Sequence, residues 1–192
     1  MLIGILPSAD ASGMIAANDI AATIDFMNQQ PFIDADNTTV VGVSTGGWAS
    51  LAVAARNLPS ARAVVNFADG RGGHAYGRAN AVCGAERLVD AACLFSLTAR
   101  VPTLWFYSEN DSYFAPRLAR RLARTWGAGG ASAEQHVLPP YGRDGHDIAD
   151  DQAGWGCGGR RWRAFWIAPR GAPRSVIKMA DGVEMKPTVG QQ

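Results

Sequence analysis

The sequence predicts an α/β fold in which a mostly parallel β-sheet is flanked by helices. Short runs rich in β-branched and aromatic residues alternate along the chain with helical stretches, as in sheets whose strands are joined by crossover helices. The 192 residues are enough to bury roughly 70% of the unfolded chain's surface in a single core. We therefore expect one domain over residues 1–167. A loosely ordered tail is expected over residues 168–192, which contain Pro169, Pro173 and Pro187.

Each predicted element has its own residue pattern. A helix is expected over residues 15–29, where Ile20, Ile24 and Met27 are among the apolar positions. The β-branched run 37–43 predicts a strand, and the stretch 47–56 alternates small and apolar residues as a packed helix does. The alternation then continues with strand 63–67, helix 86–98, strand 101–107, helix 116–126 and strand 134–138.

Residues 42–47 read Gly-Val-Ser-Thr-Gly-Gly and connect a predicted strand directly to a predicted helix. A serine in such a sharp turn projects its hydroxyl outward, and Gly42 and Gly46 would let the strand and the helix approach closely. The helix then begins beside the hydroxyl, so the backbone N–H of Thr45 is a candidate oxyanion donor. Ser44 is therefore a candidate nucleophile. The alternative is that Ser44 only caps the helix.

A serine hydroxyl needs a base, which is usually an imidazole, and the chain has three histidines. His74 lies in a glycine-rich loop that offers little to hold its ring, and His136 is expected on the polar face of strand 134–138. His146 follows that strand in a loop rich in turn residues, which is where a catalytic base belongs. The alternative for His146 is a solvated loop histidine.

The imidazole in turn needs a carboxylate to orient it. Asp111 follows the apolar strand 101–107, and the order Ser44, Asp111, His146 is the order found in hydrolases built on a mostly parallel sheet. Taken alone, Asp111 is as well explained as a cap of helix 116–126. The rival carboxylates are Glu109, Asp144 and Asp69, the last because it also follows a strand.

These three motifs, residues 42–47, residues 102–107 with Asp111, and Gly145 with His146, resemble the α/β-hydrolases, and among them the dienelactone hydrolase-like proteins. The resemblance covers roughly residues 14–150. It implies that Ser44 is the nucleophile, that His146 is the base and that Asp111 orients the base. Some dienelactone hydrolases use a cysteine nucleophile, whereas this chain has Ser44 at that position.

The chain departs from this family at both ends. In the family several strands, and the loop with the second oxyanion N–H, precede the serine, so the chain is expected to be truncated at its N-terminus. Three explanations are open: a truncated gene product, a partner that covers the exposed sheet edge, or a fold-back of residues 5–9 that supplies the donor. Near the other end, the glycine-rich residues 154–159 interrupt the helix expected after the histidine.

Two functions follow from these observations. The first is a serine hydrolase that cleaves a small ester or lactone through an acyl-enzyme intermediate, a reaction that needs no cofactor and no metal. The second is a catalytically inactive hydrolase-like fragment that binds a ligand or partner. The expected partners are a small-molecule ester or lactone and, if a sheet edge is exposed, a second subunit that covers it.

Composition argues against several other classes of function. With 18 basic and 17 acidic residues, the charge gives no indication of binding to nucleic acid or to an anionic membrane. The arginines of the helix 116–126 predict a solvated face, and a basic cluster with tryptophans near residue 160 predicts a surface patch rather than a polyanion site. These residues are Arg117, Arg120, Arg121 and Arg124 in the helix, and Trp155, Arg160, Arg161, Trp162 and Arg163 in the cluster.

Cys83, Cys93 and Cys157 match no zinc or thioredoxin-like spacing and are expected to be buried or free thiols. Residues 1–13 lack the features of a secretion signal, and no apolar run of ~18 residues could cross a bilayer, so a cytoplasmic location is expected.

Two further features have alternative explanations. The segment 69–84 is either a lid or a plain long loop. Trp48, Tyr113 and Phe114 either line an apolar substrate pocket or belong to the core.

Overall fold

The structure, a computed structural model, describes residues 8–150, and these residues contain a four-stranded parallel sheet. The strands lie side by side in chain order, β1-β2-β3-β4. The prediction of a parallel sheet is confirmed. The strands are β1 (Thr38–Val43), β2 (Ala61–Phe67), β3 (Thr103–Ser108) and β4 (Ala133–Leu138).

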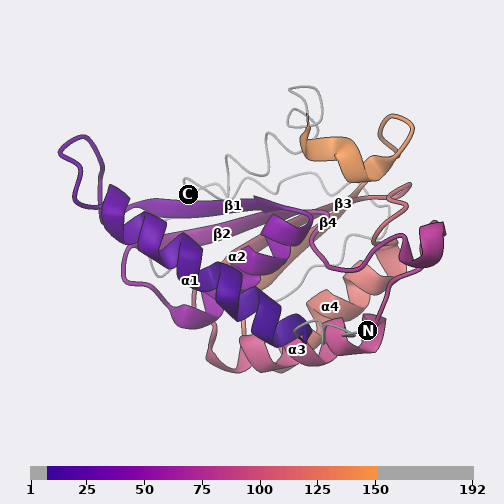
Figure 1. The fold of residues 1–192 in the computed structure, drawn as a ribbon, viewed down its shortest axis with the longest axis horizontal. Helices are drawn as coiled ribbons and strands as arrows, with labels where there is room; N and C mark the ends of the chain where they lie inside the picture. The colour runs from indigo at the N-terminus through magenta and orange to yellow at the C-terminus, as the bar shows by residue number, and fades with distance from the viewer. Residues whose placement is uncertain (1–7, 151–192) are drawn as a thin grey trace, which may run out of the picture.

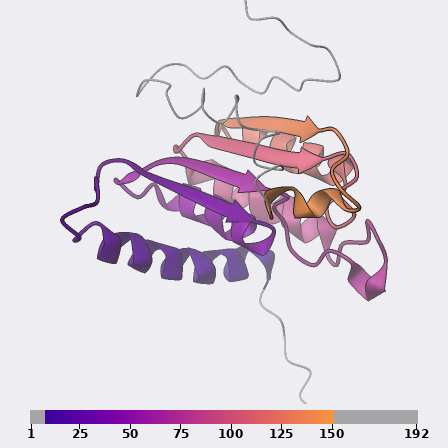
Figure 2. The same cartoon turned by 90° about the horizontal axis from the view of Figure 1, so that it is seen from above.

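Four long helices pack on one face of this sheet (Figure 1). They are α1 (Ala9–Met27), α2 (Thr45–Arg56), α3 (Ala85–Thr98) and α4 (Pro116–Ala128). Parallel crossovers are almost always right-handed, so a sheet whose strands follow one another in chain order carries all its crossover helices on the same face. Two short helical turns, η1 (Ala75–Gly77) and η2 (Gly145–Ala149), lie in loops. Figure 2 shows η2 beside the carboxyl ends of the strands.

Helix α1 begins six residues before the predicted start at residue 15, at Ala9. Its first turns contain a serine and a glycine, which are weak helix formers, and the helix there is held by packing instead. A Cβ at Gly13 would lie 2.9 Å from the Phe95 ring of α3, so only glycine allows this close approach. The Trp48 Nε1–H of α2 also donates a 2.9 Å hydrogen bond to the Ala9 carbonyl oxygen.

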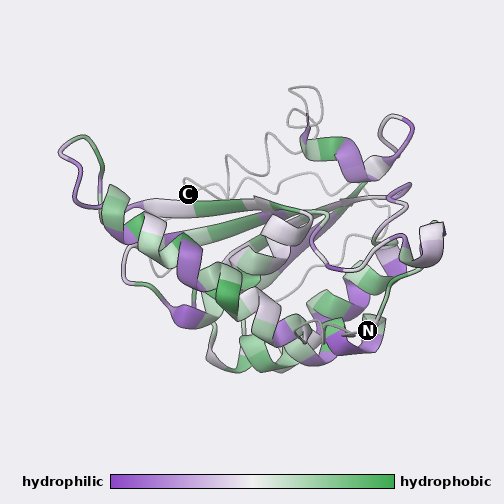
Figure 3. Cartoon of the chain, viewed as in Figure 1, coloured by the Kyte–Doolittle hydropathy of each residue, from purple (hydrophilic) through white to green (hydrophobic). Residues whose placement is uncertain are grey.

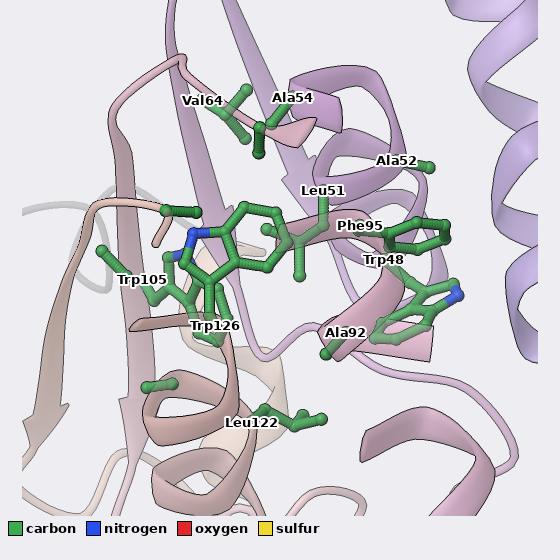
Figure 4. Close-up of a cluster of buried hydrophobic side chains, with 14 of the residues drawn as sticks. Trp48, Leu51, Ala52, Ala54, Val64, Ala92, Phe95, Trp105, Leu122 and Trp126 are labelled. Carbon is green, nitrogen blue, oxygen red and sulfur yellow. The ribbon is translucent and has the colours of Figure 1, made fainter. Parts of the chain in front are cut away.

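The main core lies between the sheet and the four helices (Figure 4). Trp105 of β3 meets Trp126 of α4 edge to face at 5.6 Å, and Trp48 contacts Phe95 at the same centroid distance. Trp48 is therefore a core residue and does not line a pocket. Figure 3 shows hydrophobic and hydrophilic stretches alternating along α4, whose Leu118 and Leu122 are buried, while Arg117 and Arg124 are exposed.

A second apolar cluster covers the opposite face of the sheet. It contains Val65 and Phe67 of β2, Leu104 and Phe106 of β3, and Ile148 of η2, all of them buried. The segment that carries η2 is thereby anchored to the sheet next to the strand ends. This anchoring sets the position of the loop that precedes η2.

Several expectations concern residues beyond those described. The tail 168–192, the glycine-rich residues 154–159, the basic cluster near residue 160 and Cys157 all lie outside residues 8–150. Within the described part, Cys83 and Cys93 are exposed free thiols. No helix formed by residues 8–150 combines the length and apolar character that a membrane crossing requires.

Candidate active site

Ser44 occupies a strained turn between β1 and α2. Its backbone has φ 53° and ψ −120°, a conformation that non-glycine residues rarely adopt. The turn is held by three backbone hydrogen bonds. The Ser44 N–H donates to the Phe67 carbonyl oxygen at 2.9 Å, and the Ser44 carbonyl oxygen accepts the N–H groups of Trp48 at 3.0 Å and Gly70 at 3.3 Å. Ser44 caps α2 by position, but its side chain makes no capping hydrogen bond. The hydroxyl is therefore available for another partner.

The close approach of strand and helix depends on Gly42 and Gly47. A Cβ at Gly42 would lie 2.5 Å from the Gly46 carbonyl carbon, and one at Gly47 would lie 2.7 Å from the Asp69 Cβ. By contrast, a Cβ at Gly46 would meet no atom within 4 Å. The expectation that Gly46 itself provides the space was wrong, because the Cβ position of Gly46 faces open space and only its backbone is crowded.

His146 is the partner of the Ser44 hydroxyl. Its Nε2 lies 3.0 Å from Ser44 Oγ, across 102 positions of the sequence. The backbone around His146 is fixed by Asp144, whose Oδ1 accepts the His146 N–H at 3.0 Å as the cap of η2. His146 is thus a held residue rather than a solvated loop histidine, and its ring nitrogen is placed to exchange a proton with the serine.

Asp111 faces the other nitrogen of the same imidazole. His146 Nδ1 lies 3.3 Å from one Asp111 carboxylate oxygen and 3.4 Å from the other. Asp111 Oδ1 also accepts the backbone N–H groups of Tyr113 and Phe114, at 2.8 and 2.9 Å. Asp111 is therefore a cap of its own turn and not of α4, whose N-cap is Ala115. The turn fixes the carboxylate beside His146.

The three rival carboxylates have other surroundings or other partners than the imidazole of His146. Glu109 is exposed, and Asp144 is used in capping η2 and in holding Ser112. Burial is the largest influence on the pKa of Asp144 and raises it, but the hydrogen bonds from Ser112 and His146 outweigh burial, so that the pKa is lowered. Asp69 is fully buried beneath α2 and accepts a hydrogen bond from the Tyr107 hydroxyl. Burial raises the pKa of Asp69 to about 7.

The two remaining histidines differ from their sequence-based descriptions. His136 lies in β4 as expected, but it is buried rather than on a polar face, with Nε2 2.7 Å from Glu134 Oε1 and its ring 5.6 Å from that of Phe106. The expectation for His74 was also wrong, because its ring is held firmly. His74 stacks on Tyr113 at 3.7 Å and its Nε2 lies 2.7 Å from Ser112 Oγ.

The oxyanion role of Thr45 at the start of α2 stays a prediction. Thr45 is the first residue of the helix, so its backbone N–H has no acceptor within α2. Residues 5–7, which were expected to fold back and supply a donor, lie outside the described residues. The described Ser8 and Ala9 are the cap and first residue of α1.

Two contacts around the base could not be found from local sequence patterns. The Tyr113 ring stacks on the His146 ring at 4.2 Å, and the Phe114 ring lies 5.6 Å from it. Both aromatic residues had been singled out as possible pocket or core residues, but nothing in their neighbourhood indicates that they would contact a histidine more than thirty positions away. No group of three or more His, Cys, Asp or Glu side chains within residues 8–150 is arranged to hold a metal ion.

Comparison with known proteins shows a likeness in structure only. No protein-family model matches the chain, and no curated protein sequence matches it. Among solved structures, a Klebsiella pneumoniae protein provisionally assigned as a dienelactone hydrolase gives a TM-score of 0.57 at 18% identity, over 78% of this chain and 59% of that one. An esterase of Pyrococcus furiosus gives 0.55 at 9% identity, over 79% and 62%.

A further match is the dipeptidyl peptidase 4 of Porphyromonas gingivalis, with a TM-score of 0.58 at 15% identity, over 80% of this chain and 22% of that one. This chain therefore spans less than two thirds of the length of each of these proteins. The likeness shows a common fold, and it does not extend to a substrate.

Proposed function

The chain has the α/β-hydrolase fold, and on this premise we propose that it is a serine hydrolase that cleaves a small ester or lactone through an acyl-enzyme intermediate. The observation that carries the proposal is the 3.0 Å separation between His146 Nε2 and Ser44 Oγ, with Asp111 on the other side of the imidazole. Nucleophile, base and orienting carboxylate then act as one unit.

In the first half of the proposed reaction, His146 Nε2 takes the hydroxyl proton of Ser44 while Oγ forms a bond to the substrate's carbonyl carbon. The π electrons of the carbonyl move to its oxygen, and the Thr45 N–H stabilises the resulting oxyanion. The imidazole now carries a positive charge. The Asp111 carboxylate stabilises that charge and holds Nδ1 protonated, so that Nε2 is free to accept the proton.

The tetrahedral intermediate then collapses. The C–O bond to the leaving alcohol breaks, and the leaving oxygen takes the proton from His146 Nε2, which leaves an acyl group on Ser44. In a lactone this alcohol remains attached to the acyl chain. Water next attacks the acyl carbon and gives its proton to Nε2. Expulsion of Ser44 Oγ, which regains that proton, releases the carboxylic acid.

Hydrolysis of short p-nitrophenyl esters and small lactones tests this proposal. We expect wild-type protein to hydrolyse at least one of them and Ser44→Ala to fall to the background rate, since the nucleophile is removed. Ser8→Ala is the matched control, because Ser8 is exposed at the start of α1 and it is expected to keep wild-type activity.

Two outcomes would overturn the proposal. One is hydrolysis that persists in Ser44→Ala, which would mean that another group is the nucleophile. The other is a folded wild-type protein without activity on any of these substrates, which would favour the catalytically inactive, ligand-binding alternative.

A further inference from the structure

A closed set of contacts joins the segment 69–84 to the loops that carry Asp111 and His146. The Asp144 Oδ1 accepts the backbone N–H groups of His146 and Ser112, both at 3.0 Å, and its Oδ2 accepts the Ser112 hydroxyl. Ser112 Oγ lies 2.7 Å from His74 Nε2. The His74 ring stacks on Tyr113, and Tyr113 stacks on the His146 ring. These five residues form a circuit that begins at the backbone of His146 and ends at its ring, and we call it the Tyr113 clamp.

The hydrogen bonds of the Tyr113 clamp have a definite direction. A carboxylate only accepts, so the Ser112 hydroxyl proton goes to Asp144. The Ser112 oxygen is then left to accept a hydrogen bond, and His74 must donate it through Nε2–H. Ser112 is therefore not a second nucleophile with His74 as its base, because its proton is already directed at the carboxylate. These hydrogen bonds hold the His74 ring in place.

The His74 ring is held parallel to Tyr113. The two planes differ by 7° at a centroid distance of 3.7 Å, and the Tyr113 and His146 planes differ by 24° at 4.2 Å. Tyr113 is thus enclosed between two imidazoles. The Gly73 backbone also lies close to this ring, since a Cβ at Gly73 would lie 2.9 Å from Tyr113 Cδ1. Because the Tyr113 ring is confined, it limits the rotation of the His146 ring stacked on it.

Segment 69–84 is attached to the same place by its backbone. The Asn80 N–H donates to the Ser112 carbonyl oxygen at 2.6 Å, and the Cys83 N–H donates to the Gly72 carbonyl oxygen at 2.8 Å. His74 itself has φ 55°, a left-handed conformation that a non-glycine residue adopts at some cost. The segment is therefore folded so as to present His74 to Tyr113.

We propose that His74 is a positioning residue for the base: through Tyr113 it holds the His146 imidazole in the orientation that receives the Ser44 proton. The inference rests on the proposed function, because it assigns a purpose to the ring orientation of His146. Proton transfer depends on the direction of Nε2 as well as on its distance, so a ring that rotates freely spends less time in the reactive geometry.

Steady-state kinetics of the ester hydrolysis test the proposal. His74→Ala and Tyr113→Leu should each lower kcat by roughly threefold to tenfold, the equivalent of losing one stacked ring, with KM little changed. Tyr113→Phe keeps the stacked ring and should have the kcat of the wild-type protein. Tyr76→Ala is the matched control: Tyr76 lies in the same segment with a similar positive φ, but its side chain is 94% exposed.

A double variant separates positioning from a merely structural effect. Because His74 acts through Tyr113, adding His74→Ala to Tyr113→Leu should lower kcat no further. Losses that multiply, or an unchanged kcat in His74→Ala, would overturn the proposal while leaving the proposed function intact.

A second measurement does not depend on activity. The Tyr113 ring shields the His146 ring protons, so their NMR resonances should move downfield in Tyr113→Leu and broaden in His74→Ala, but stay unchanged in Tyr76→Ala. Unchanged His146 resonances in His74→Ala would overturn the positioning role. If the resonances respond but the wild-type protein hydrolyses no ester, the proposed function fails, and the catalytic role of His74 fails with it.

Discussion

At the scale of single residues, the Asp111 carboxylate combines a structural task with an electrostatic one. Its Oδ1 accepts two backbone N–H groups of its own turn, and the same carboxylate faces His146 Nδ1. Ser44, Asp111 and His146 could be selected from the sequence because each follows a strand and their order is distinctive. The contacts of His74 could not be predicted, because they join loops about forty positions apart and no local pattern encodes them.

Asp111→Asn tests this pair of tasks. The amide keeps an oxygen for the turn, so the protein should fold, but its N–H₂ group faces Nδ1 and favours the imidazole tautomer that cannot accept the serine proton. We expect kcat for ester hydrolysis to fall by about 10⁴-fold, the effect of this change in a serine protease triad. Glu109→Gln, an exposed neighbour, should leave kcat unchanged. Similar rates in wild type and Asp111→Asn would exclude Asp111 as the orienting carboxylate.

At the scale of elements, the junction of β1 and α2 determines where the hydroxyl of Ser44 points. The β-branched run of β1 and the small residues of α2 predicted the bounds of both elements to within two residues. In both elements the local residue pattern agrees with the structure that the complete fold requires. The early start of α1 could not be predicted from its sequence, because Gly13 is helical there through its contact with Phe95 of a distant helix. Local propensity fails where tertiary packing decides.

Two alanine substitutions within the junction make a matched pair. Gly42→Ala would bring a Cβ against the Gly46 carbonyl group, which cannot move without shifting the turn, and should cost about 1–3 kcal/mol of stability together with most of the activity. Gly46→Ala has open space around its Cβ and should keep both. Thermal unfolding and ester hydrolysis measure the two effects. Equal losses in the two variants would contradict the proposed origin of the tight junction.

At the scale of the whole molecule, the strand order places the three crossover helices α2, α3 and α4 on one face of the sheet, and α1 packs on the same side (Figure 1). The parallel sheet could be predicted from the alternation of patterns, but the strand order and the burial of individual polar groups depend on the complete fold. Asp69 is an example. Gly47 of α2 and Tyr107 of β3 enclose it, and its Oδ2 has no hydrogen-bond partner among the described residues.

This burial predicts a dependence of stability on pH. Burial raises the folded-state pKa of Asp69 from 3.8 to about 7, so between these values the folded state holds a proton that the unfolded state has released. The free energy of unfolding therefore falls as the pH rises through this range. Asp69→Asn cannot ionise, so its stability relative to wild type should rise between pH 5 and pH 8, by at most about 3 kcal/mol. Urea unfolding of both proteins measures the difference, and a difference that is constant with pH would contradict the buried acid.

The central claim, that Ser44 is an activated nucleophile, is tested most directly by locating a covalent adduct. Folded wild-type protein is treated with a fluorophosphonate, which reacts with activated serines, and the modified residue is identified by mass spectrometry of the digested protein. We predict one adduct per chain, on Ser44, because among residues 8–150 this is the hydroxyl that lies 3.0 Å from an imidazole whose other nitrogen faces a carboxylate. An adduct on another residue, or the absence of any adduct on the folded protein, would contradict the claim.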